Sequence, residues 1–223
     1  MTNRLQTVLI LLCGMLLAAG AAAPAAAETP YEQAVLAELN AARSNPAAYL
    51  ERLRGYRAFF HDKLIYMPGL KAAIQTEEGV GVVNETIAFL DRQRPLDPVR
   101  TAGLLRTAAA DHVAEQAESG STGHGGEDGS SPGDRVERRG GGAYVAEVIA
   151  YGSIDPADVV RQLIVDDGVP DRGHRSVLFS PELRFAGVSC GTHPEYRTMC
   201  VIDLGITAEG RFPDKQPLVV ASR

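Results

Sequence analysis

Two histidines in glycine-flanked loops are the residues of this chain best suited to chemistry. They are His124, in a Gly-His-Gly segment, and His174, in a Gly-His-Arg segment. Candidate acids lie between them: Glu147 in an otherwise apolar stretch, and the adjacent Asp166 and Asp167. A carboxylate inside an apolar strand is costly unless it is paired or bound to something. We therefore expect Glu147 to have a partner.

Imidazoles and carboxylates together can make two kinds of site. If they converge on a cleft, they supply the N and O ligands that zinc or a similar divalent ion takes, with a position left open for water or substrate. The same groups can instead form a hydrogen-bond cluster that holds loops to a sheet. His124 and Glu147 are 23 residues apart, and the two aspartates lie 8 and 7 residues before His174. Such spacing is not a metal-ligand code, so both interpretations remain open.

Other residues with chemical potential are better explained structurally. The segment Gly187–Gly191 matches the G-x-S-x-G nucleophile pattern, but that motif requires a strand, a sharp turn and a helix. Here a second predicted strand follows, so we expect Ser189 to lie in a strand. His112 lies on an apolar helix stripe and is expected to be a hydrogen-bonded core residue, whereas His61 and His193 are expected at the surface.

Residues 1–27 predict a secretory signal peptide. Arg4 supplies a positive start, and residues 8–19 form an apolar run. That run is shorter than the roughly 20 residues that a permanent membrane helix needs. The small residues Ala25-Ala26-Ala27 then give a cleavage pattern before Glu28. We expect a secreted or periplasmic protein with no permanent membrane anchor.

Removal of the signal peptide would reduce the number of cysteines from three to two. It takes away Cys13 and leaves Cys190 and Cys200. These two lie on the arms of a hairpin predicted from strands over 185–190 and 198–205. An even pair in an exported protein predicts a disulfide.

Composition limits the classes of function. With 223 residues, 45% hydrophobic and 22% charged, the chain is long enough for one domain with a substantial core. Its formal charge of -6 argues against nucleic-acid binding, which requires clustered basic residues on one face. Aromatic residues make up only 6% and tryptophan is absent, which makes aromatic stacking platforms for carbohydrate or single-stranded nucleic acid less favoured.

Capping residues and apolar spacing predict the elements that must position the candidate site. Helices are predicted to begin at Thr29-Pro30, Asn45-Pro46, about Asn84, Asp97-Pro98, Asp155-Pro156 and about His174. Strands are predicted over 144–151 and over the two arms of the hairpin, with a glycine-rich loop over 120–142 and an unassigned stretch over 55–82. Helices followed by strands indicate an α+β fold in which helices pack on a small antiparallel sheet.

Several motifs, in their order along the chain, resemble those of a known family. They are Asn40-Ala-Ala-Arg-Ser-Asn-Pro46, the helix end Ala109–Ala117, His124, the loop Gly129–Val136, Glu147, and Gly173–Leu178 leading to Ala186–Val188. In this order they resemble the CAP superfamily, which comprises cysteine-rich secretory proteins, insect antigens, plant pathogenesis-related proteins and many bacterial exported relatives. The resemblance covers about residues 29–207.

The resemblance implies a three-layer α-β-α sandwich with a small antiparallel sheet and a central cleft that holds two histidines and two acids. By position, His124 and His174 match the histidines and Glu147 matches the first acid. The second acid falls at Asp166, with Asp167 as the close competitor.

The resemblance also divides the chain. Residues 28–95 would hold N-terminal helices with a family-atypical insertion at about 55–82, residues 96–210 the core of the domain, and residues 211–223 a C-terminal tail. Leu163 stands where the family has a tryptophan. This departure affects the expected shape of the cleft more than its four polar groups.

The family hosts several activities, so its fold does not decide the function. We expect a monomeric exported protein whose cleft binds a divalent metal, with zinc favoured, and a lipid, sterol-like ligand or cell-envelope component. The alternative is a metal-dependent, peptidase-like hydrolase in which a metal-activated water reacts and Glu147 or the aspartate pair acts as general base. A third reading is a purely structural polar cluster. Binding is favoured over catalysis because the sequence offers no independently recognisable nucleophile.

Overall fold

The computed structural model of the chain describes residues 27–153 and 155–212. The predicted signal peptide, apart from Ala27, and the predicted tail beyond Phe212 lie outside the described residues. The helices are α1 (Pro30–Ser44), α2 (Pro46–Arg57), α3 (Val80–Arg92), α4 (Gly103–Ser119), α5 (Pro132–Arg138), α6 (Pro156–Val165) and α7 (Gly173–Leu178). The strands are β1 (Phe60–His61), β2 (Leu64–Ile65), β3 (Ile74–Gln75), β4 (Arg100–Thr101), β5 (Val145–Tyr151), β6 (Phe185–His193) and β7 (Arg197–Gly205).

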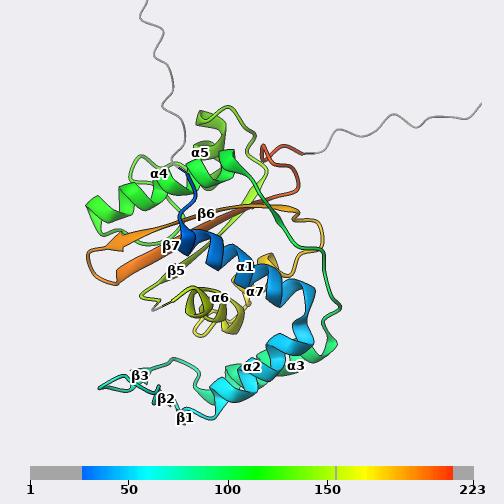
Figure 1. The fold of residues 1–223 in the computed structure, drawn as a ribbon. Coiled ribbons are helices and arrows are strands. Elements are labelled where there is room, and N and C mark those ends of the chain that lie inside the picture. Colours follow the sequence, from blue (N-terminus) through cyan, green and yellow to red (C-terminus); the bar gives the residue numbers. More distant parts are fainter. Residues whose placement is uncertain (1–26, 154, 213–223) are drawn as a thin grey trace, which may run out of the picture.

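Three layers build the main body (Figure 1). The central sheet has the strand order β4-β6-β7-β5, and α4 packs across β6 and β7 on one face. On the other side, α1 packs against β6 and α6, while α6 and α7 lie against β5. The predicted α+β sandwich is confirmed. The sheet is mixed rather than wholly antiparallel, because the short strand β4 runs parallel to β6.

Local capping chemistry starts several helices where the sequence predicts. Thr29 and Glu32 form a reciprocal capping box at α1, Asn45 caps α2, and Asp155 caps α6. A further capping box, made by Ser131 and Asp134, starts α5 inside the stretch predicted to be a glycine-rich loop. Such caps satisfy the N–H groups that the first helical turn leaves unpaired.

The long helix predicted to begin at Asp97-Pro98 instead begins at Gly103, because the backbone before it bonds elsewhere. The Asn40 side-chain amide donates to the Val99 carbonyl at 3.0 Å and accepts from the Val99 N–H at 2.8 Å. The Ala102 N–H donates to β6 at 2.8 Å. These long-range bonds hold residues 97–102 extended and make β4 an edge of the sheet.

The buried Arg43 guanidinium bonds α1 to segments that are distant in the sequence. It is 1% exposed and donates to backbone carbonyls rather than to an acid. Its acceptors are the carbonyls of Leu178 at 2.5 Å, Ser180 at 3.1 Å, Leu183 at 3.1 Å and Asp97 at 3.2 Å. One side chain therefore satisfies carbonyl groups of two segments, one before β4 and one from the end of α7 to β6, that would otherwise be buried without partners.

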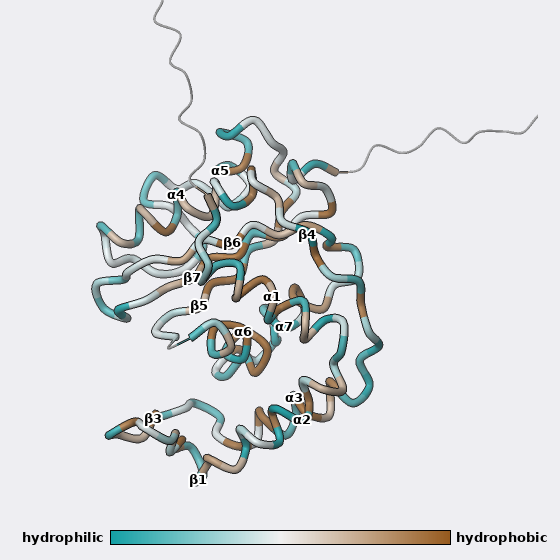
Figure 2. The backbone as a smooth tube through the Cα atoms, in the orientation of Figure 1, coloured by the Kyte–Doolittle hydropathy of each residue, from teal (hydrophilic) through white to brown (hydrophobic). Residues whose placement is uncertain are grey.

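Strand alternation separates two apolar layers. Ala186 and Val188 of β6 belong to the main core with α1, α2, α3 and α6, whereas Met199 and Val201 of β7 pack with α4. Apolar stretches accordingly gather at the centre of the molecule in Figure 2, where α1 and α6 meet the sheet. Gly187 faces α4 so closely that a Cβ atom there would lie 1.9 Å from the Arg106 backbone nitrogen.

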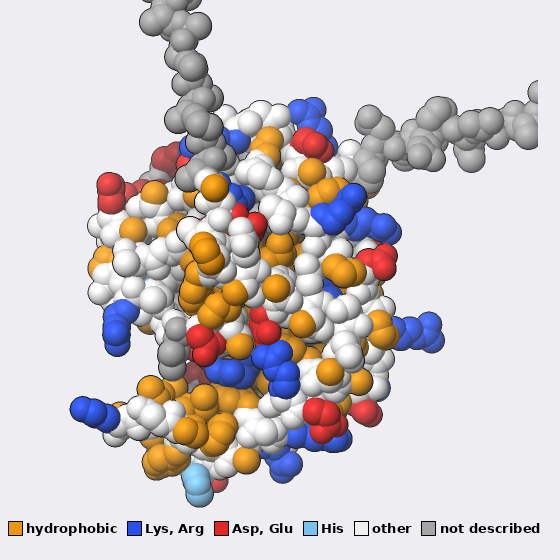
Figure 3. Space-filling model, in the orientation of Figure 1, with side chains coloured by type: hydrophobic (Ala, Val, Ile, Leu, Met, Phe, Trp, Pro, Cys, Tyr) orange, Lys and Arg blue, Asp and Glu red, His pale blue; other side chains and the backbone are white. Residues whose placement is uncertain are grey.

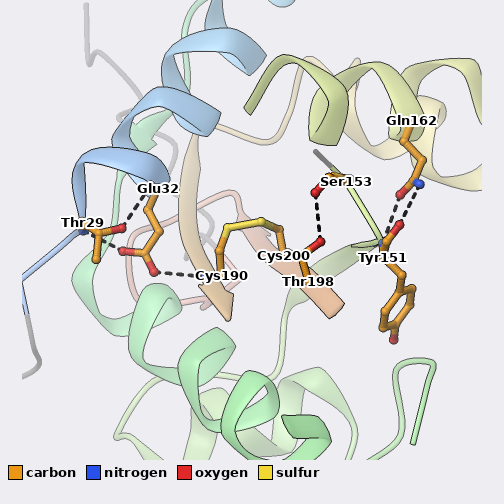
Figure 4. Close-up of a disulfide and its surroundings, with 8 residues drawn as sticks. All are labelled: Thr29, Glu32, Tyr151, Ser153, Gln162, Cys190, Thr198 and Cys200. Atoms are coloured by element: carbon orange, nitrogen blue, oxygen red, sulfur yellow. Dashed lines mark hydrogen bonds between the residues drawn. A yellow bond between two sulfur atoms is a disulfide. The ribbon is translucent and has the colours of Figure 1, made fainter. Parts of the chain in front are cut away.

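Cys190 and Cys200 form the predicted disulfide (Figure 4). They lie directly opposite each other on β6 and β7, with Cα atoms 4.1 Å apart. The capping residue Glu32 accepts from the Cys190 N–H at 3.1 Å, so the first turn of α1 is bonded to the disulfide strand. Ser189 lies within β6 and is buried, which confirms that the G-x-S-x-G match is part of a strand.

Residues 58–79, called here the 58–79 arm, fill much of the stretch left unassigned by the sequence. They contain the small antiparallel sheet β1-β2-β3 and extend below α6 in Figure 1. The arm joins α2 to α3, which pack on each other. None of the helices in the described part of the chain is long and apolar enough to cross a membrane.

Candidate functional site

One imidazole of the candidate site is hydrogen-bonded to a buried carboxylate. His124 Nδ1 lies 2.9 Å from Glu147 Oε1, and the side chain of Glu147 is fully buried while that of His124 is 49% exposed. Glu147 is in β5, an edge strand of the sheet, and His124 follows α4. His124, in the loop after α4, is thus the partner that Glu147 was predicted to need.

Arg135 of α5 holds the other oxygen of the same carboxylate. Its Nη2 donates to Glu147 Oε2 at 2.7 Å, and its Nη1 donates to the His124 carbonyl at 3.1 Å. Burial raises the pKa of Glu147, but the His124 hydrogen bond and the Arg135 guanidinium outweigh it and hold that pKa below its usual value. Glu147 is therefore an ionised carboxylate with both oxygens engaged.

Asp203 of β7 is a second buried acid at this place, and sequence analysis missed it. It is 0% exposed and lies directly opposite Glu147 on the neighbouring strand. Neither of its carboxylate oxygens has a hydrogen-bond partner among the described residues. Burial and the negative charge of Glu147 raise the pKa of Asp203 well above its usual value. Asp203 interrupts an apolar strand just as Glu147 does, so the same reasoning would have found it.

The raised pKa of Asp203 predicts that stability falls with increasing pH. Below 3.8, its usual pKa, Asp203 is protonated in the folded and the unfolded chain. Above that pH the unfolded chain releases the proton while the folded protein retains it, so unfolding becomes more favourable until the pH exceeds the folded pKa. Urea unfolding at several pH values between about 5 and 8 should show this decline in the wild type and a flatter profile for Asp203→Asn. Parallel profiles would refute the assignment.

The second imidazole also rests on a buried acid. His174, at the start of α7, places Nδ1 2.6 Å from Asp166 Oδ1, and the Arg175 N–H donates to Asp166 Oδ2 at 3.2 Å. Asp166 ends α6 in the left-handed region, with φ of 61°, a conformation that aspartate tolerates better than most residues. This backbone turn points the carboxylate at His174.

Asp167, the competing candidate, bonds elsewhere. Its carboxylate accepts from the Glu77 and Glu78 N–H groups, both at 2.8 Å, just before α3. It therefore ties the base of the 58–79 arm to the end of α6. Asp166 is the acid that lies beside the second histidine.

The two histidine–carboxylate pairs lie side by side. The rings of His124 and His174 have centroids 6.4 Å apart and are inclined by 51°. Both acids are at most 1% exposed as side chains, whereas the imidazoles are 49% and 25% exposed. A carboxylate can only accept a hydrogen bond, so each Nδ1 carries the proton and a neutral ring keeps an unprotonated Nε2.

A buried network fixes the loop that carries His124. The Gly123 carbonyl lies 2.8 Å from His112 Nε2 and 2.7 Å from the donating Gln116 amide, and the Gly123 N–H donates to the Tyr151 hydroxyl at 2.9 Å. His112 is therefore the hydrogen-bonded core residue that its helix stripe predicts.

The other two histidines lie outside the pair. His61 is exposed, as predicted. The surface prediction for His193 is wrong: it is 2% exposed, because its Nε2 bonds the Ser121 carbonyl at 3.0 Å and its ring packs on Tyr151 and Tyr196.

The free edge of β5 is bonded by a side chain from α6. The Gln162 carbonyl oxygen accepts from the Tyr151 N–H at 3.1 Å, and its amide donates to the Tyr151 carbonyl at 2.9 Å (Figure 4). Unpaired strand edges otherwise invite pairing with another chain. The bond also fixes α6, and with it Asp166, against the strand that carries Glu147.

A cavity of about 500 Å³ adjoins His174 and Asp166, between α6 and the 58–79 arm. Figure 3 shows the molecule hollowed at this place, with hydrophobic side chains along the arm. Its apolar and aromatic lining comprises Tyr56, Phe60, Ile65, Ile74, Val82, Ile149, Tyr151, Leu163, Val165, Val169 and Tyr196. Its polar lining comprises Gln75, Thr76, Asp158, Arg161, Gln162, Asp166, Asp167 and His174, and Gly152 completes the wall.

Fewer residues are placed to bind a metal than the five predicted from the sequence. Within the described residues, no group of three or more His, Cys, Asp and Glu side chains is arranged to hold a metal ion. Glu147 and Asp166 lie on the Nδ1 side of their histidines. The Nε2 atoms of His124 and His174 are the imidazole nitrogens not bonded to these acids, and metal binding stays a prediction.

Comparison with known proteins gives the wider context. The model of the cysteine-rich secretory protein (CAP) family matches residues 36–204. A solved outer surface protein from Borrelia burgdorferi is similar in structure, with a TM-score of 0.41 and 17% sequence identity, over 49% of this chain and 77% of that one. No curated protein matches significantly in sequence. The family match spans most of the chain, including both histidine–carboxylate pairs, and so the chain belongs to the CAP family of cysteine-rich secretory proteins.

Proposed function

We propose that this protein is an extracytoplasmic binding protein whose cleft takes a divalent cation, with zinc as the first candidate, together with a ligand that has an apolar part. The observation that carries the proposal is the pair of neighbouring imidazoles, with ring centroids 6.4 Å apart, each bonded through Nδ1 to a buried carboxylate. Metal-ligating histidines almost always donate their second ring nitrogen to such a partner, which fixes the tautomer and the ring orientation.

The residues fit an open site rather than a closed one. His124 and His174 would hold the ion through Nε2, while Glu147 and Asp166 would orient the rings. Structural zinc sites are closed by four protein ligands, and catalytic or binding sites keep positions open. A bound zinc ion would supply a Lewis-acidic positive centre with room for water or a ligand oxygen.

The adjoining cavity supports a lipid-like or sterol-like ligand. Its volume lies within the range of small-molecule sites, which are mostly apolar with a few polar groups that fix orientation. The apolar side chains of Phe60, Ile65 and Ile74 line the arm side, and His174 with Asp166 lies at the cleft. A ligand could bind the ion through an oxygen atom and place its apolar part against the side chains of the arm.

The geometry favours binding over hydrolysis. A general base must come within hydrogen-bond reach of the proton that it removes. Both oxygens of Glu147 are engaged, by His124 and by Arg135, and the side chain is fully buried. Asp166 is likewise bonded by His174 and by the Arg175 backbone. Each acid is therefore better placed to hold an imidazole than to activate water.

An extracytoplasmic location agrees with two observations. The matched family is that of cysteine-rich secretory proteins, and Cys190 and Cys200 form a disulfide. Structural disulfides persist mainly in oxidising compartments. The signal peptide predicted over residues 1–27 would bring the chain there.

Zinc titration of metal-stripped protein tests the proposal. The wild type should bind one equivalent, and His124→Ala or His174→Ala should weaken binding by about 100-fold or more, since each removes one of two protein ligands. The adjacent aspartates supply a matched pair: Asp166→Asn should cost about 10- to 100-fold in affinity because it frees the His174 ring, whereas Asp167→Asn should leave zinc affinity unchanged. His61→Ala is the control for an exposed histidine. Unchanged binding in both His124→Ala and His174→Ala would overturn the proposal.

A further inference from the structure

The 58–79 arm carries several large apolar side chains that are exposed in the part of the chain that the structure describes. Among the exposed large hydrophobic side chains of the described residues, Tyr66, Leu70 and Ile74 all lie in this arm, at 53%, 42% and 41% exposure. Figure 3 shows hydrophobic side chains across the arm in the lower part of the molecule. Large apolar side chains that gather on one short segment mark an interaction site more often than scattered ones do.

The small sheet of the arm has an apolar inner face and a mixed outer face, on which Leu64 lies beside His61 and Gln75. Phe60, Ile65 and Ile74 are cross-strand neighbours that line the cavity, so they share its inner face. Since side chains alternate along a strand, Leu64 and Tyr66 belong to the opposite face. On that outer face Tyr66 is 53% exposed. A three-stranded sheet of two-residue strands has little core of its own, so a partner on this face would add to its stability.

Basic side chains surround this apolar surface. Lys63 and Lys71, two of the three lysines in the whole chain, flank Tyr66 and Leu70, and Arg57 lies just before the arm. All three cations are exposed and form no ion pair with any described residue. Asp62 is the one acid between residues 57 and 75, whereas the whole chain has a formal charge of -6.

Of the two acids at the base of the arm, Glu78 is paired with the main body, because its carboxylate accepts from Arg172 at 2.6 Å. The backbone N–H groups of Glu77 and Glu78 donate to Asp167. Residues 57–75, with three cations against one acid, therefore form a positive end on a molecule whose formal charge is -6. An anionic surface would attract this end and repel the remainder, which orients the molecule before contact.

We propose that the exposed surface of the 58–79 arm docks on an anionic lipid bilayer surface, with Tyr66 and Leu70 entering the interface and Lys63, Lys71 and Arg57 contacting lipid headgroups. Aromatic and aliphatic side chains flanked by lysines are the composition that binds at membrane interfaces, where each basic residue adds to the affinity for anionic lipid. Ile74 is both exposed and part of the cavity lining, so docking would bring the rim of the cavity to the bilayer. The proposal is independent of the metal site.

Vesicle co-sedimentation of the full chain, expressed for export, tests the proposal. Vesicles of phosphatidylcholine with about 30% phosphatidylglycerol should bind the protein at least about tenfold more tightly than phosphatidylcholine alone, and binding should weaken between about 0.05 M and about 0.5 M NaCl. Lys63→Gln with Lys71→Gln should weaken binding by about 10- to 30-fold. Tyr66→Ser with Leu70→Ser should weaken it by about tenfold at both salt concentrations, because the lost contact is apolar.

Matched controls lie elsewhere on the surface. Arg92→Gln with Arg94→Gln removes two exposed cations outside the arm, and Tyr144→Ser removes an aromatic side chain that is 51% exposed. Both should bind vesicles like the wild type, and thermal unfolding should confirm that every variant folds. Equal binding to the two vesicle types, or unchanged binding of both arm variants, would overturn the proposal. A concentration-dependent dimer abolished by Tyr66→Ser with Leu70→Ser, without vesicle binding, would overturn it in favour of self-association.

Discussion

Replacing Arg135 by methionine should lower the free energy of unfolding by about 3 to 5 kcal/mol, the range expected when one partner of a buried ion pair is removed. The guanidinium is 3% exposed as a side chain and donates to Glu147 at 2.7 Å. Without it, the ionised Glu147 would retain only the His124 hydrogen bond and would face Asp203 across the sheet. Guanidinium chloride or urea unfolding measures the loss.

A double variant separates the charge effect from lost packing. Glu147→Gln removes the carboxylate that Arg135→Met leaves unpaired, so the double variant should be more stable than Arg135→Met alone. If Arg135→Met costs less than about 1 kcal/mol, or if the two substitutions simply add, Glu147 does not depend on Arg135 as described.

Replacing Gly187 by alanine should be at least as damaging, with a loss of about 4 kcal/mol or more, at the upper end of overpacking effects. The added Cβ would lie 1.9 Å from the Arg106 nitrogen and 2.3 Å from the Leu105 carbonyl carbon, both in the backbone of α4. Backbone cannot yield as a flexible side chain can, so β6 and α4 would have to separate. Gly187 also lies in register with Asp203, so the shift would reach the site.

Gly55 provides the matched control for this substitution. It lies inside α2, and a Cβ there would meet nothing within 4 Å. Gly55→Ala should leave stability unchanged or raise it by up to about 1 kcal/mol, because alanine is the better helix former. The comparison uses the thermal midpoint of each variant. A Gly187→Ala protein as stable as the wild type would mean that the close approach of β6 to α4 is wrong.

Much of the fold was predictable because it depends on neighbouring residues. The capping box of Thr29 and Glu32, the apolar alternation of β6 and β7, and the pairing of Cys190 with Cys200 are local patterns. The start of α4 was not, because the bonds from Asn40 to Val99 join residues 59 positions apart. Long-range hydrogen bonds of this kind override a local capping signal.

The residues of the candidate site were easier to predict than the hydrogen bonds among them. The cost of burying Glu147 correctly indicated a partner, but Arg135 lies in a helix that the glycine-rich composition concealed. Asp203 satisfied the same criterion and was overlooked. The choice between Asp166 and Asp167 depends on the left-handed backbone at Asp166, a conformation that neither composition nor spacing reveals.

X-ray absorption spectroscopy at the zinc K-edge, on the zinc-loaded chain, measures whether His124 and His174 bind one ion together. Two imidazole nitrogens are expected at about 2.0 to 2.1 Å, with oxygen atoms completing the coordination, and one imidazole fewer in His174→Ala loaded at high zinc concentration. A spectrum without imidazole scattering, or one that is identical in the wild type, His124→Ala and His174→Ala, would contradict joint binding of one ion.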